Sequence, residues 1–224
     1  MSGVEGLRTN REYVMKLPRL YAIVDAARAA RSGWDPVDLA RAYLAGGARL
    51  VQLRAENVSS GLLLEWTDAI VDAARAVGAT VIVNNRADVA KLAGADGVHV
   101  GQDDLPVRSV RALLGDAAVV GLSTHTSPQV DLALAEPAAY LAVGPVYGTR
   151  TKDTGYTALG LEFVREAARK AGARPVVAIG GIDLDRAGDV IRAGAASVAV
   201  ISDLMEGDDP QARTRAYIDV LERL

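Results

Sequence analysis

The 224-residue chain contains no cysteine, which excludes disulfides, thiolate metal sites and a cysteine nucleophile. Aromatic residues make up only 4% of it, too few for the stacking platforms that bind single-stranded nucleic acid. The formal net charge is −3, and no segment gathers enough lysine or arginine for a nucleic-acid or membrane surface. No apolar run approaches the ~18 residues of a membrane-spanning helix, and residues 1–17 lack a signal-peptide core. We therefore expect a cytoplasmic protein that binds neither nucleic acid nor a membrane.

Half of the residues are hydrophobic, which is enough for one large core. Short runs rich in β-branched residues alternate with alanine-rich helical patterns along the whole chain. The expected strands are LYAIVD from Leu20, LVQLR from Leu50, TVIVNN from Thr80, GVHVGQ from Gly97, VVGLST from Val119, YLAVGPV from Tyr140, PVVAIGG from Pro175 and SVAVIS from Ser197. Such nearly continuous apolar strands are typical of a parallel sheet covered by helices.

Eight strands, each followed by a helix, predict a single (β/α)8 TIM barrel spanning residues 18–224. Residues 1–17 form an N-terminal arm, either packed on the barrel or disordered. A doubly wound open sheet is the rival fold, but it would have fewer strands and a glycine-rich turn after the first one, where this chain has VDAARAARSG. Several predicted helices end in an AG pair before a strand, as in AGADGVHV, and the glycine there suits a left-handed helix cap.

One helix is expected within SGLLLEWTDAIVDAARAVG, residues 60–78. Its apolar residues recur at helical spacing and predict one buried stripe. The members of this stripe are Leu62, Leu63, Trp66, Ile70, Val71 and Ala74.

Polar residues follow most of the predicted strands, where a barrel places its active site. Strand by strand along the chain, the ends carry Gln52 and Arg54, Asn84 and Asn85, Gln102 with Asp103 and Asp104, Ser123 with Thr124 and His125, the segment 149–152, the glycine turn Gly180 and Gly181, and Ile201 with Ser202. The last three groups predict a phosphate site, because barrels often bind phosphate with the loops after strands seven and eight. Thr149 and Thr151 would add hydroxyl donors to the backbone N–H groups of Gly181, Ile201 and Ser202.

Six segments together resemble the successive active-site motifs of the thiamine phosphate synthase family. They are VQLR, IVNN, ADGVHVGQDDLP, GLSTHT, GPVYGTRTKDT and AIGGI with VAVIS, in matching order from about Leu20 to Met205. The resemblance implies a transferase that joins a hydroxymethylpyrimidine diphosphate to a hydroxyethylthiazole phosphate and releases diphosphate, with Mg²⁺ as cofactor.

The resemblance also implies a role for each matching residue. Gln52 would contact the pyrimidine, and Ser123 would lie near both the pyrimidine and the diphosphate. Arg54, Asn84 and Lys152 would hold the diphosphate, so Arg54, Ser123 and Lys152 are the predicted catalytic residues. The thiazole phosphate would be bound by Thr149, Thr151, Gly181, Ile201 and Ser202, and Mg²⁺ by Asp104. Cations and a hard metal suit a diphosphate leaving group, on which negative charge develops.

Two positions depart from the usual family pattern. The lysine that usually follows the arginine by two residues is Glu56 here, and the usual Asn-Asp pair is Asn84-Asn85. The site thus loses one diphosphate cation and one metal carboxylate. Asn85 would be a weakened Mg²⁺ ligand. Glu56 would either reach the metal in place of the missing carboxylate or lie on a flexible loop with its charge pointing outward.

Two other functions stay open from the sequence. A thiazole tautomerase-like isomerase would use His125 as a proton shuttle, and a non-catalytic barrel would bind thiazole phosphate or thiamine phosphate without turnover. We expect a structural role for His99, and we expect only one of the adjacent Asp103 and Asp104 to enter the pocket. A homodimer is also open.

Overall fold

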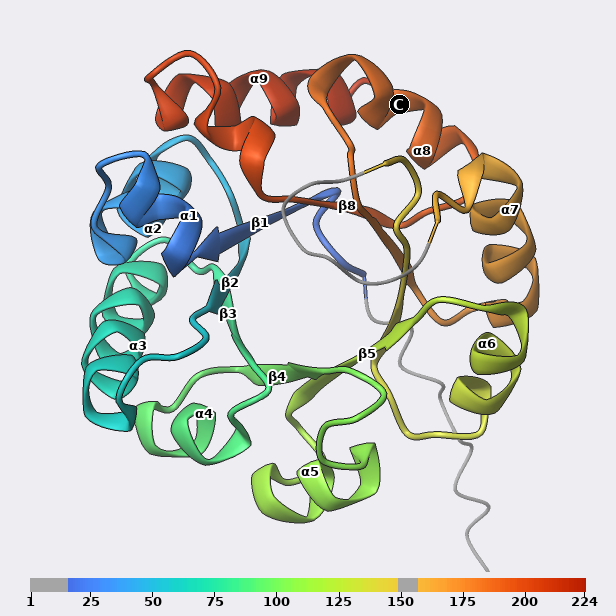
Figure 1. Ribbon diagram of the computed structural model, residues 1–224, viewed down its shortest axis with the longest axis horizontal. Helices are drawn as coiled ribbons and strands as arrows, with labels where there is room; N and C mark the ends of the chain where they lie inside the picture. Colours follow the sequence, from blue (N-terminus) through green and yellow to red (C-terminus); the bar gives the residue numbers. More distant parts are fainter. Residues whose placement is uncertain (1–15, 149–156) are drawn as a thin grey trace, which may run out of the picture.

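The computed structural model describes residues 16–148 and 157–224. Within them, eight parallel strands close into one barrel in sequence order, and the last strand pairs with the first. Figure 1 looks along this barrel and shows the helices arranged as a ring around it. The predicted single (β/α)8 barrel is therefore confirmed, and the rival open sheet is wrong. Most of the expected N-terminal arm and the segment 149–156 lie outside the described residues.

Seven of the eight strands begin at the residue expected from the sequence. Their bounds are β1 Leu20–Asp25, β2 Leu50–Arg54, β3 Thr80–Asn84, β4 Gly97–Val100, β5 Val119–Thr124, β6 Tyr140–Val143, β7 Val176–Ile179 and β8 Ser197–Val200. Only β7 starts one residue late, after Pro175. Proline has no N–H for the ladder, although the Pro175 carbonyl still accepts a hydrogen bond from Leu141 N at 3.1 Å.

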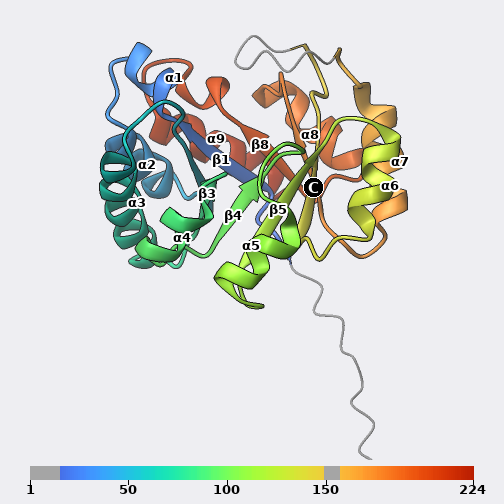
Figure 2. The ribbon, with the colours of Figure 1, turned by 60° about the horizontal axis from the view of Figure 1, so that its bottom comes forward.

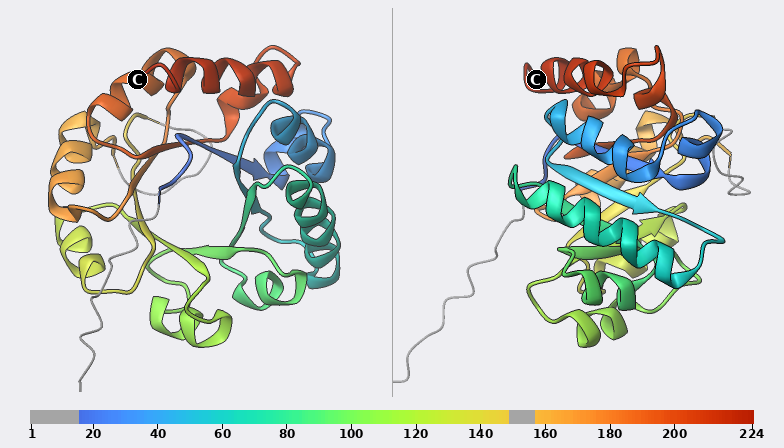
Figure 3. Two further views of the ribbon diagram at one scale, coloured as in Figure 1. Left: turned by 180° about the vertical axis from the view of Figure 1, so that it is seen from behind. Right: turned by 90° about the vertical axis from the view of Figure 1, so that its left-hand side faces the viewer.

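The helices follow the strands on the outside of the barrel. They are α1 Ala26–Arg31, α2 Pro36–Ala45, α3 Ser60–Arg75, α4 Ala87–Ala93, α5 Val107–Leu114, α6 Ser127–Leu134, α7 Gly160–Ala171, α8 Leu184–Arg192 and α9 Pro210–Leu221, with a 3₁₀ helix η1 at Ser202–Met205. Figure 2 shows α6 beside α7, and Figure 3 shows α9 lying across the outside of the barrel. Among the described helices, none has the length and apolar character that crossing a membrane requires.

The buried stripe of α3 differs from the expected one. Leu62 is 37% exposed, whereas Thr67, which was not predicted, is fully buried. Thr67 lies one turn after Leu63 and donates its hydroxyl proton to the Leu63 carbonyl at 2.6 Å. This bond removes the cost of burying the hydroxyl, so a polar residue fits the core-facing position.

The expected left-handed glycine cap is present at the end of α4, whereas the caps of α2 and α8 are right-handed. Gly94 ends α4 with a φ of +65°, immediately before the chain enters β4. At the end of α2 the cap itself, Gly46, is right-handed, and the next residue, Gly47, takes the positive φ of +106°. Glycine meets this conformation without the steric cost of a Cβ.

The core has two parts, one between strands and helices and one inside the barrel. The inner part contains Tyr21, Ile23, Leu50, Ile82 and Tyr140, with Leu17 packed against them at 5% exposure. Polar Gln52 and His99 are buried inside the barrel as well. The barrel interior is thus apolar near one end and increasingly polar toward the other.

Candidate active site

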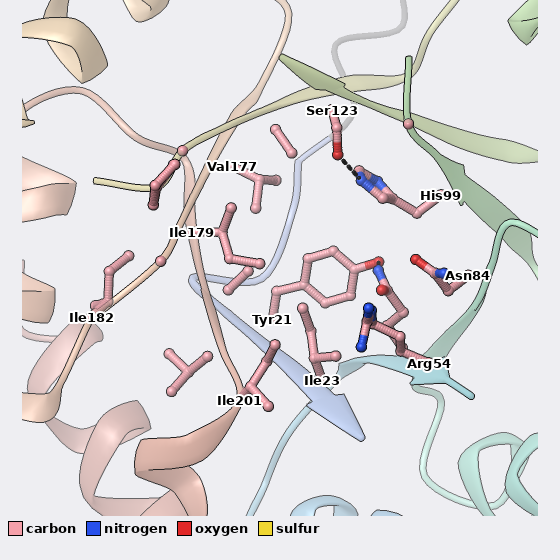
Figure 4. Close-up of a pocket in the computed structure, with 18 of the residues that line it drawn as sticks. Tyr21, Ile23, Arg54, Asn84, His99, Ser123, Val177, Ile179, Ile182 and Ile201 are labelled. Carbon is pink, nitrogen blue, oxygen red and sulfur yellow. Dashed lines mark hydrogen bonds between the residues drawn. The ribbon is translucent and has the colours of Figure 1, made fainter. Parts of the chain in front are cut away.

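A cavity of about 620 Å³ opens at the carboxyl ends of the strands. Figure 4 shows that its two sides differ in chemistry. The labelled polar residues come from β2 to β5, and the labelled aliphatic residues come from β1, from β7 and from the loops after β7 and β8. The loops after β7 and β8 also contribute polar residues, namely Asp183, Ser202, Asp203 and Glu206. The polar set includes Arg54, Asn84, His99 and Ser123, and the apolar set includes Ile23, Val177, Ile179, Ile182 and Ile201.

Most of the predicted site residues line this one cavity. They are Gln52, Arg54, Asn84, Asn85, Asp104, Ser123, His125, Gly181, Ile201 and Ser202. Glu56 is not among the lining residues, but it contacts Arg54. Thr149, Thr151 and Lys152 lie outside the described residues.

Arg54 is held between two carboxylates. Asp25 ends β1 opposite Arg54 in the strand register, and its Oδ2 forms an ion pair with Arg54 Nη1. The Asp25 side chain is only 4% exposed, and its other oxygen caps α1 by accepting from Arg28 N at 2.8 Å. Sequence reasoning missed Asp25, although its place at the end of the neighbouring strand was a usable signal. Burial and two hydrogen bonds make Asp25 a fixed support for the guanidinium.

The second carboxylate belongs to Glu56. Its Oε1 lies 2.5 Å from Arg54 Nη2, while the side chain is 52% exposed. Its charge is therefore shared between Arg54 and solvent, and the alternative of an outward-pointing carboxylate stays open. Glu56 as a metal ligand stays a prediction.

Asp103 and Asp104 both line the cavity, so the expectation that only one enters is wrong. That expectation assumed a strand, on which neighbouring side chains alternate. Strand β4 ends at Val100, and the two aspartates lie in the turn that follows. Asp104 Oδ2 accepts a hydrogen bond from Gly101 N at 2.7 Å, which fixes the turn.

The donor set suits a magnesium site that depends on the substrate. Within residues 16–148 and 157–224, no group of three or more His, Asp or Glu side chains could hold a metal ion. Mg²⁺ commonly binds through one or two carboxylates together with phosphate oxygens and water. Asp104, with the neutral oxygen of Asn85 on the same cavity wall, fits that arrangement but offers one carboxylate.

At the other end of the cavity, two loops meet through glycine. Gly181 has a φ of +65°, and a Cβ there would lie 2.5 Å from the Gly148 carbonyl oxygen. Tyr147 N donates to the Gly180 carbonyl at 2.9 Å, so the loops after β6 and β7 are joined directly. Only glycine allows this contact.

Asp203 in η1 ties the last two loops to α9. Its Oδ2 accepts hydrogen bonds from Leu184 N at 3.2 Å, from Arg213 Nη2 at 2.7 Å and from Tyr217 Oη at 2.5 Å. Burial raises the pKa of the Tyr217 hydroxyl, and the neighbouring Asp203 carboxylate raises it further. The tyrosine therefore stays protonated and keeps donating. Asp203 was not predicted, and it fixes the segment that carries Ser202.

A series of hydrogen bonds runs through the barrel interior, and all of its residues except Tyr140 line the cavity. Gln52 Nε2 donates to Tyr21 Oη at 2.6 Å, and Tyr21 Oη lies 3.0 Å from Tyr140 Oη. Tyr140 Oη lies 3.0 Å from His99 Nδ1, and His99 Nε2 lies 2.8 Å from Ser123 Oγ. Figure 4 marks the last of these contacts. The two tyrosines were not predicted as site residues, and His99 points into the barrel rather than under the helices.

His125 is anchored by the loop after β6. Its Nδ1 lies 2.6 Å from the Gly144 carbonyl oxygen, and its backbone N–H donates to Gln129 Oε1 at 2.7 Å. A carbonyl oxygen only accepts, so Nδ1 carries a proton. His125 also lines the cavity.

A closed parallel barrel with a polar cavity at its carboxyl end defines a TIM-barrel enzyme. A family model described as thiamine monophosphate synthase matches residues 20–204. The chain belongs to this family, and the resemblance seen in the motifs is confirmed.

Individual relatives agree. A thiamine-phosphate synthase of Anaeromyxobacter dehalogenans is 46% identical over 205 residues, covering 88% of this chain and 91% of that protein. One from Acidothermus cellulolyticus is 45% identical over 193 residues, covering 86% and 89%. The solved structure of a thiamine phosphate pyrophosphorylase from Pyrococcus furiosus superposes with a TM-score of 0.83 at 30% identity, covering 92% of this chain and 96% of that one.

Proposed function

We propose that the cavity joins an aminopyrimidine carried on a diphosphate to a thiazole phosphate, forming thiamine phosphate and diphosphate. The observation that carries this proposal is that a single cavity is lined by Arg54, Asp104, Ser123 and the Gly180–Gly181 turn. An arginine and a carboxylate at one end suit a metal-bridged diphosphate, and a glycine turn at the other suits a monophosphate.

The diphosphate would bind against Arg54 and Asn84. Asp25 holds the guanidinium from behind, so its orientation is set before the ligand enters. Lys152 would supply a second cation from outside the described residues. Negative charge develops on the leaving diphosphate as its bond to carbon breaks, and fixed cations stabilise that charge.

Asp104 and Asn85 would hold Mg²⁺ together with oxygens of the diphosphate. When bound, the metal supplies positive charge that stabilises the leaving group. One carboxylate in place of two leaves more of the coordination to the substrate, so metal and diphosphate are expected to bind together.

The pyrimidine would lie between Gln52 and Ser123. Its amino group helps to stabilise the methylene cation left when the diphosphate departs, so no protein nucleophile is required. The thiazole nitrogen then attacks this carbon. Apolar Ile179 and Ile201 border the same cavity and would keep water from competing.

The thiazole phosphate would sit on backbone N–H groups of Gly181, Ile201 and Ser202, with the hydroxyls of Thr149 and Thr151 added from outside the described residues. Asp203 supports this phosphate site, because its hydrogen bonds fix η1 to the start of α8 and to Arg213 of α9.

The test is to incubate the purified protein with both substrates and Mg²⁺ and to follow thiamine phosphate by thiochrome fluorescence. We expect product only when all three are present, and none with Arg54→Ala or Asp104→Ala. Arg75→Ala removes an exposed arginine of α3 and is the matched control, expected to keep activity. Absence of product from the wild-type protein would contradict the proposal.

The same assay separates the two alternatives. His125 lines the cavity with Nδ1 bound to the Gly144 carbonyl, which favours the thiazole tautomerase-like isomerase as the second candidate. Isomerisation of a carboxythiazole phosphate tautomer that His125→Ala abolishes, without coupling, would support it. Binding of thiazole phosphate without turnover would support the non-catalytic barrel. A homodimer and a location in the cytoplasm stay predictions.

A further inference from the structure

We propose that the five side chains Gln52, Tyr21, Tyr140, His99 and Ser123 form a hydrogen-bond chain with one fixed direction, which makes the Ser123 hydroxyl a donor to the substrate. Four of its members, all except Tyr140, line the cavity, and the series ends at Ser123. Its direction follows from the ligand-free protein alone. Only the identity of the substrate atom rests on the proposed function.

The direction is set at Gln52. An amide nitrogen only donates, so Tyr21 Oη accepts from Gln52 Nε2 at 2.6 Å. The proton of Tyr21 then has Tyr140 Oη, 3.0 Å away, as its acceptor. Burial raises the pKa of both tyrosines, so both hydroxyls keep their protons.

The direction then passes through His99. Tyr140 Oη accepts from Tyr21, and its own proton goes to His99 Nδ1 at 3.0 Å. Nδ1 is thus an acceptor without a proton, and the ring proton sits on Nε2, which donates to Ser123 Oγ at 2.8 Å. In the opposite tautomer, His99 Nδ1 would donate to Tyr140 Oη, and the Tyr140 hydroxyl proton would point toward Tyr21. The Tyr21 proton would then lose this acceptor inside the barrel, at the cost of a buried hydrogen bond.

Ser123 is where the direction matters. Its oxygen accepts from His99, so its own proton is left to point at an acceptor in the cavity, which Ser123 lines. On the proposed substrate, two kinds of atom can accept: a ring nitrogen of the aminopyrimidine and an oxygen of the diphosphate. Tyr21, Tyr140 and His99 are therefore positioning residues that act through Ser123.

The protein contains a second histidine that serves as an internal reference for this inference. It has two histidines, and the second, His125, donates from Nδ1 to the Gly144 carbonyl at 2.6 Å. The two rings are therefore expected to be opposite tautomers. His99 carries its proton on Nε2, and His125 carries a proton on Nδ1.

Long-range ¹H–¹⁵N spectra of the uniformly labelled, ligand-free protein at pH 8 test this directly. We expect an unprotonated Nδ1 and a protonated Nε2 for His99, with signals assigned by comparison with His125→Asn. In Tyr21→Phe and Tyr140→Phe nothing fixes the tautomer of His99. The ¹⁵N chemical shift of its Nδ1 should then move toward the average of the two tautomers. Tyr43→Phe removes a buried hydroxyl that has no hydrogen-bond partner among the described residues and is not part of the hydrogen-bond series, so it should leave both rings unchanged.

Two results would overturn the inference. One is a proton on Nδ1 of His99 in the wild-type protein, which means that the Gln52 amide is turned over and every donor is reversed. The other is a His99 spectrum that moves in neither Tyr21→Phe nor Tyr140→Phe.

Binding measurements identify the acceptor. Calorimetry with inorganic diphosphate plus Mg²⁺, and separately with the free aminopyrimidine alcohol, is compared between wild type and Ser123→Ala. Loss of one hydrogen bond should weaken one probe by about five- to tenfold and leave the other nearly unchanged. Ser123→Thr keeps the hydroxyl and should restore binding. Weakening of neither probe would overturn the donor role.

Kinetics separate this inference from the proposed function. Tyr140→Phe should lower kcat while leaving the KM for thiazole phosphate unchanged, because the thiazole end of the cavity is untouched. An active enzyme with the wrong His99 tautomer contradicts the inference alone. An inactive wild-type protein with the expected tautomer contradicts the proposed function alone.

Discussion

The carboxylate of Glu56 lies 2.5 Å from Nη2 of Arg54, on the guanidinium whose Nη1 is held by Asp25. Two negative charges therefore flank Arg54, which lies at the place proposed for diphosphate. Asp25 is buried and fixed, but Glu56 is half exposed and can leave. If diphosphate binds Arg54 as proposed, it would displace Glu56, and this carboxylate would compete with the substrate for Arg54.

Replacing Glu56 with glutamine should tighten binding of the diphosphate substrate. An exposed ion pair contributes about 0.2–1 kcal/mol, so we expect KM for the pyrimidine diphosphate to fall by up to about fivefold, with kcat little changed. Steady-state coupling kinetics measure this. Glu162→Gln breaks an exposed pair with Arg165 on α7 and serves as the control with no effect.

A different outcome would reassign Glu56. If Glu56→Gln lowered kcat and raised the Mg²⁺ concentration required, Glu56 would be a metal ligand instead of a competitor. Glu56→Lys combined with Asn85→Asp restores the usual family pattern and should raise coupling activity further. Unchanged or lower activity of this double variant would indicate a site adapted to another substrate.

Asp104→Asn should increase the Mg²⁺ concentration needed for half-maximal activity severalfold, because an amide oxygen attracts the ion less than a carboxylate does. Activity at saturating Mg²⁺ should recover in part. Titration of the coupling rate with Mg²⁺ checks this. An unchanged Mg²⁺ dependence would remove Asp104 from the metal site.

Gly181→Ala should destabilise the protein more than Gly78→Ala. Both glycines have a φ of +65°, but a Cβ at Gly78 meets nothing within 4 Å, whereas at Gly181 it would collide with the Gly148 carbonyl. The positive φ costs about 1–2 kcal/mol in each variant, and the collision adds about 1–3 kcal/mol in Gly181→Ala. Urea unfolding measures the difference. KM for thiazole phosphate should rise only in Gly181→Ala, and equal effects would contradict this account of the loop contact.

Asp203→Asn should weaken the thiazole phosphate site without touching the diphosphate. Asparagine cannot form the ion pair with Arg213, so η1 loses its firm attachment to α9. We expect a higher KM for thiazole phosphate at an unchanged KM for the pyrimidine diphosphate. Asp189→Asn breaks an exposed pair with Arg192 on α8 and is the control. Equal rises in both KM values would indicate general loss of structure instead.

The stability of the fold should fall as pH rises above the ordinary tyrosine pKa of about 10. Burial raises the pKa of Tyr43 in the folded state, so the folded protein keeps a proton that the unfolded chain loses. Burial also raises the pKa of Tyr21, Tyr140 and Tyr217, so these hydroxyls likewise keep their protons in the folded state. This contribution is complete below pH ~10 and is lost progressively above it.

Tyr43→Phe isolates one of these groups. Its hydroxyl is buried and has no partner in the described part of the chain, so its removal should leave stability at pH 7 unchanged or slightly higher. Above pH ~10, the free energy of unfolding should fall less steeply with pH in the variant than in the wild type. The two slopes should differ by about 1.4 kcal/mol per pH unit, which corresponds to the release of one proton on unfolding. Urea unfolding over this range gives both slopes, and identical slopes would contradict the account.

The strands could be predicted because their apolar runs end at polar or glycine residues that a parallel barrel requires at its rims. Once the strands are known, closure of the barrel brings Arg54 and Asp104 to one rim, so much of the site follows from the order of the motifs. Contacts within the rim could not be predicted in this way. The Asp25–Arg54 pair depends on strand register, and Glu56 depends on the path of a loop.

The barrel interior was the least predictable part. His99 alternates with Val98 and Val100, but alternation alone does not say which set of side chains points inward. Tyr21 and Tyr140 look like core residues by composition, and only their shared hydrogen bond identifies them as parts of a polar series. Asp103 and Asp104 were misjudged because a strand was assumed to continue past its end at Val100.

Simultaneous measurement of diphosphate release and thiamine phosphate formation tests the central claim most directly. The account predicts one diphosphate released for each thiamine phosphate formed by the wild-type protein with Mg²⁺, and loss of both in Arg54→Ala. Diphosphate released at the same rate without thiazole phosphate, or no coupling product at all, would contradict it.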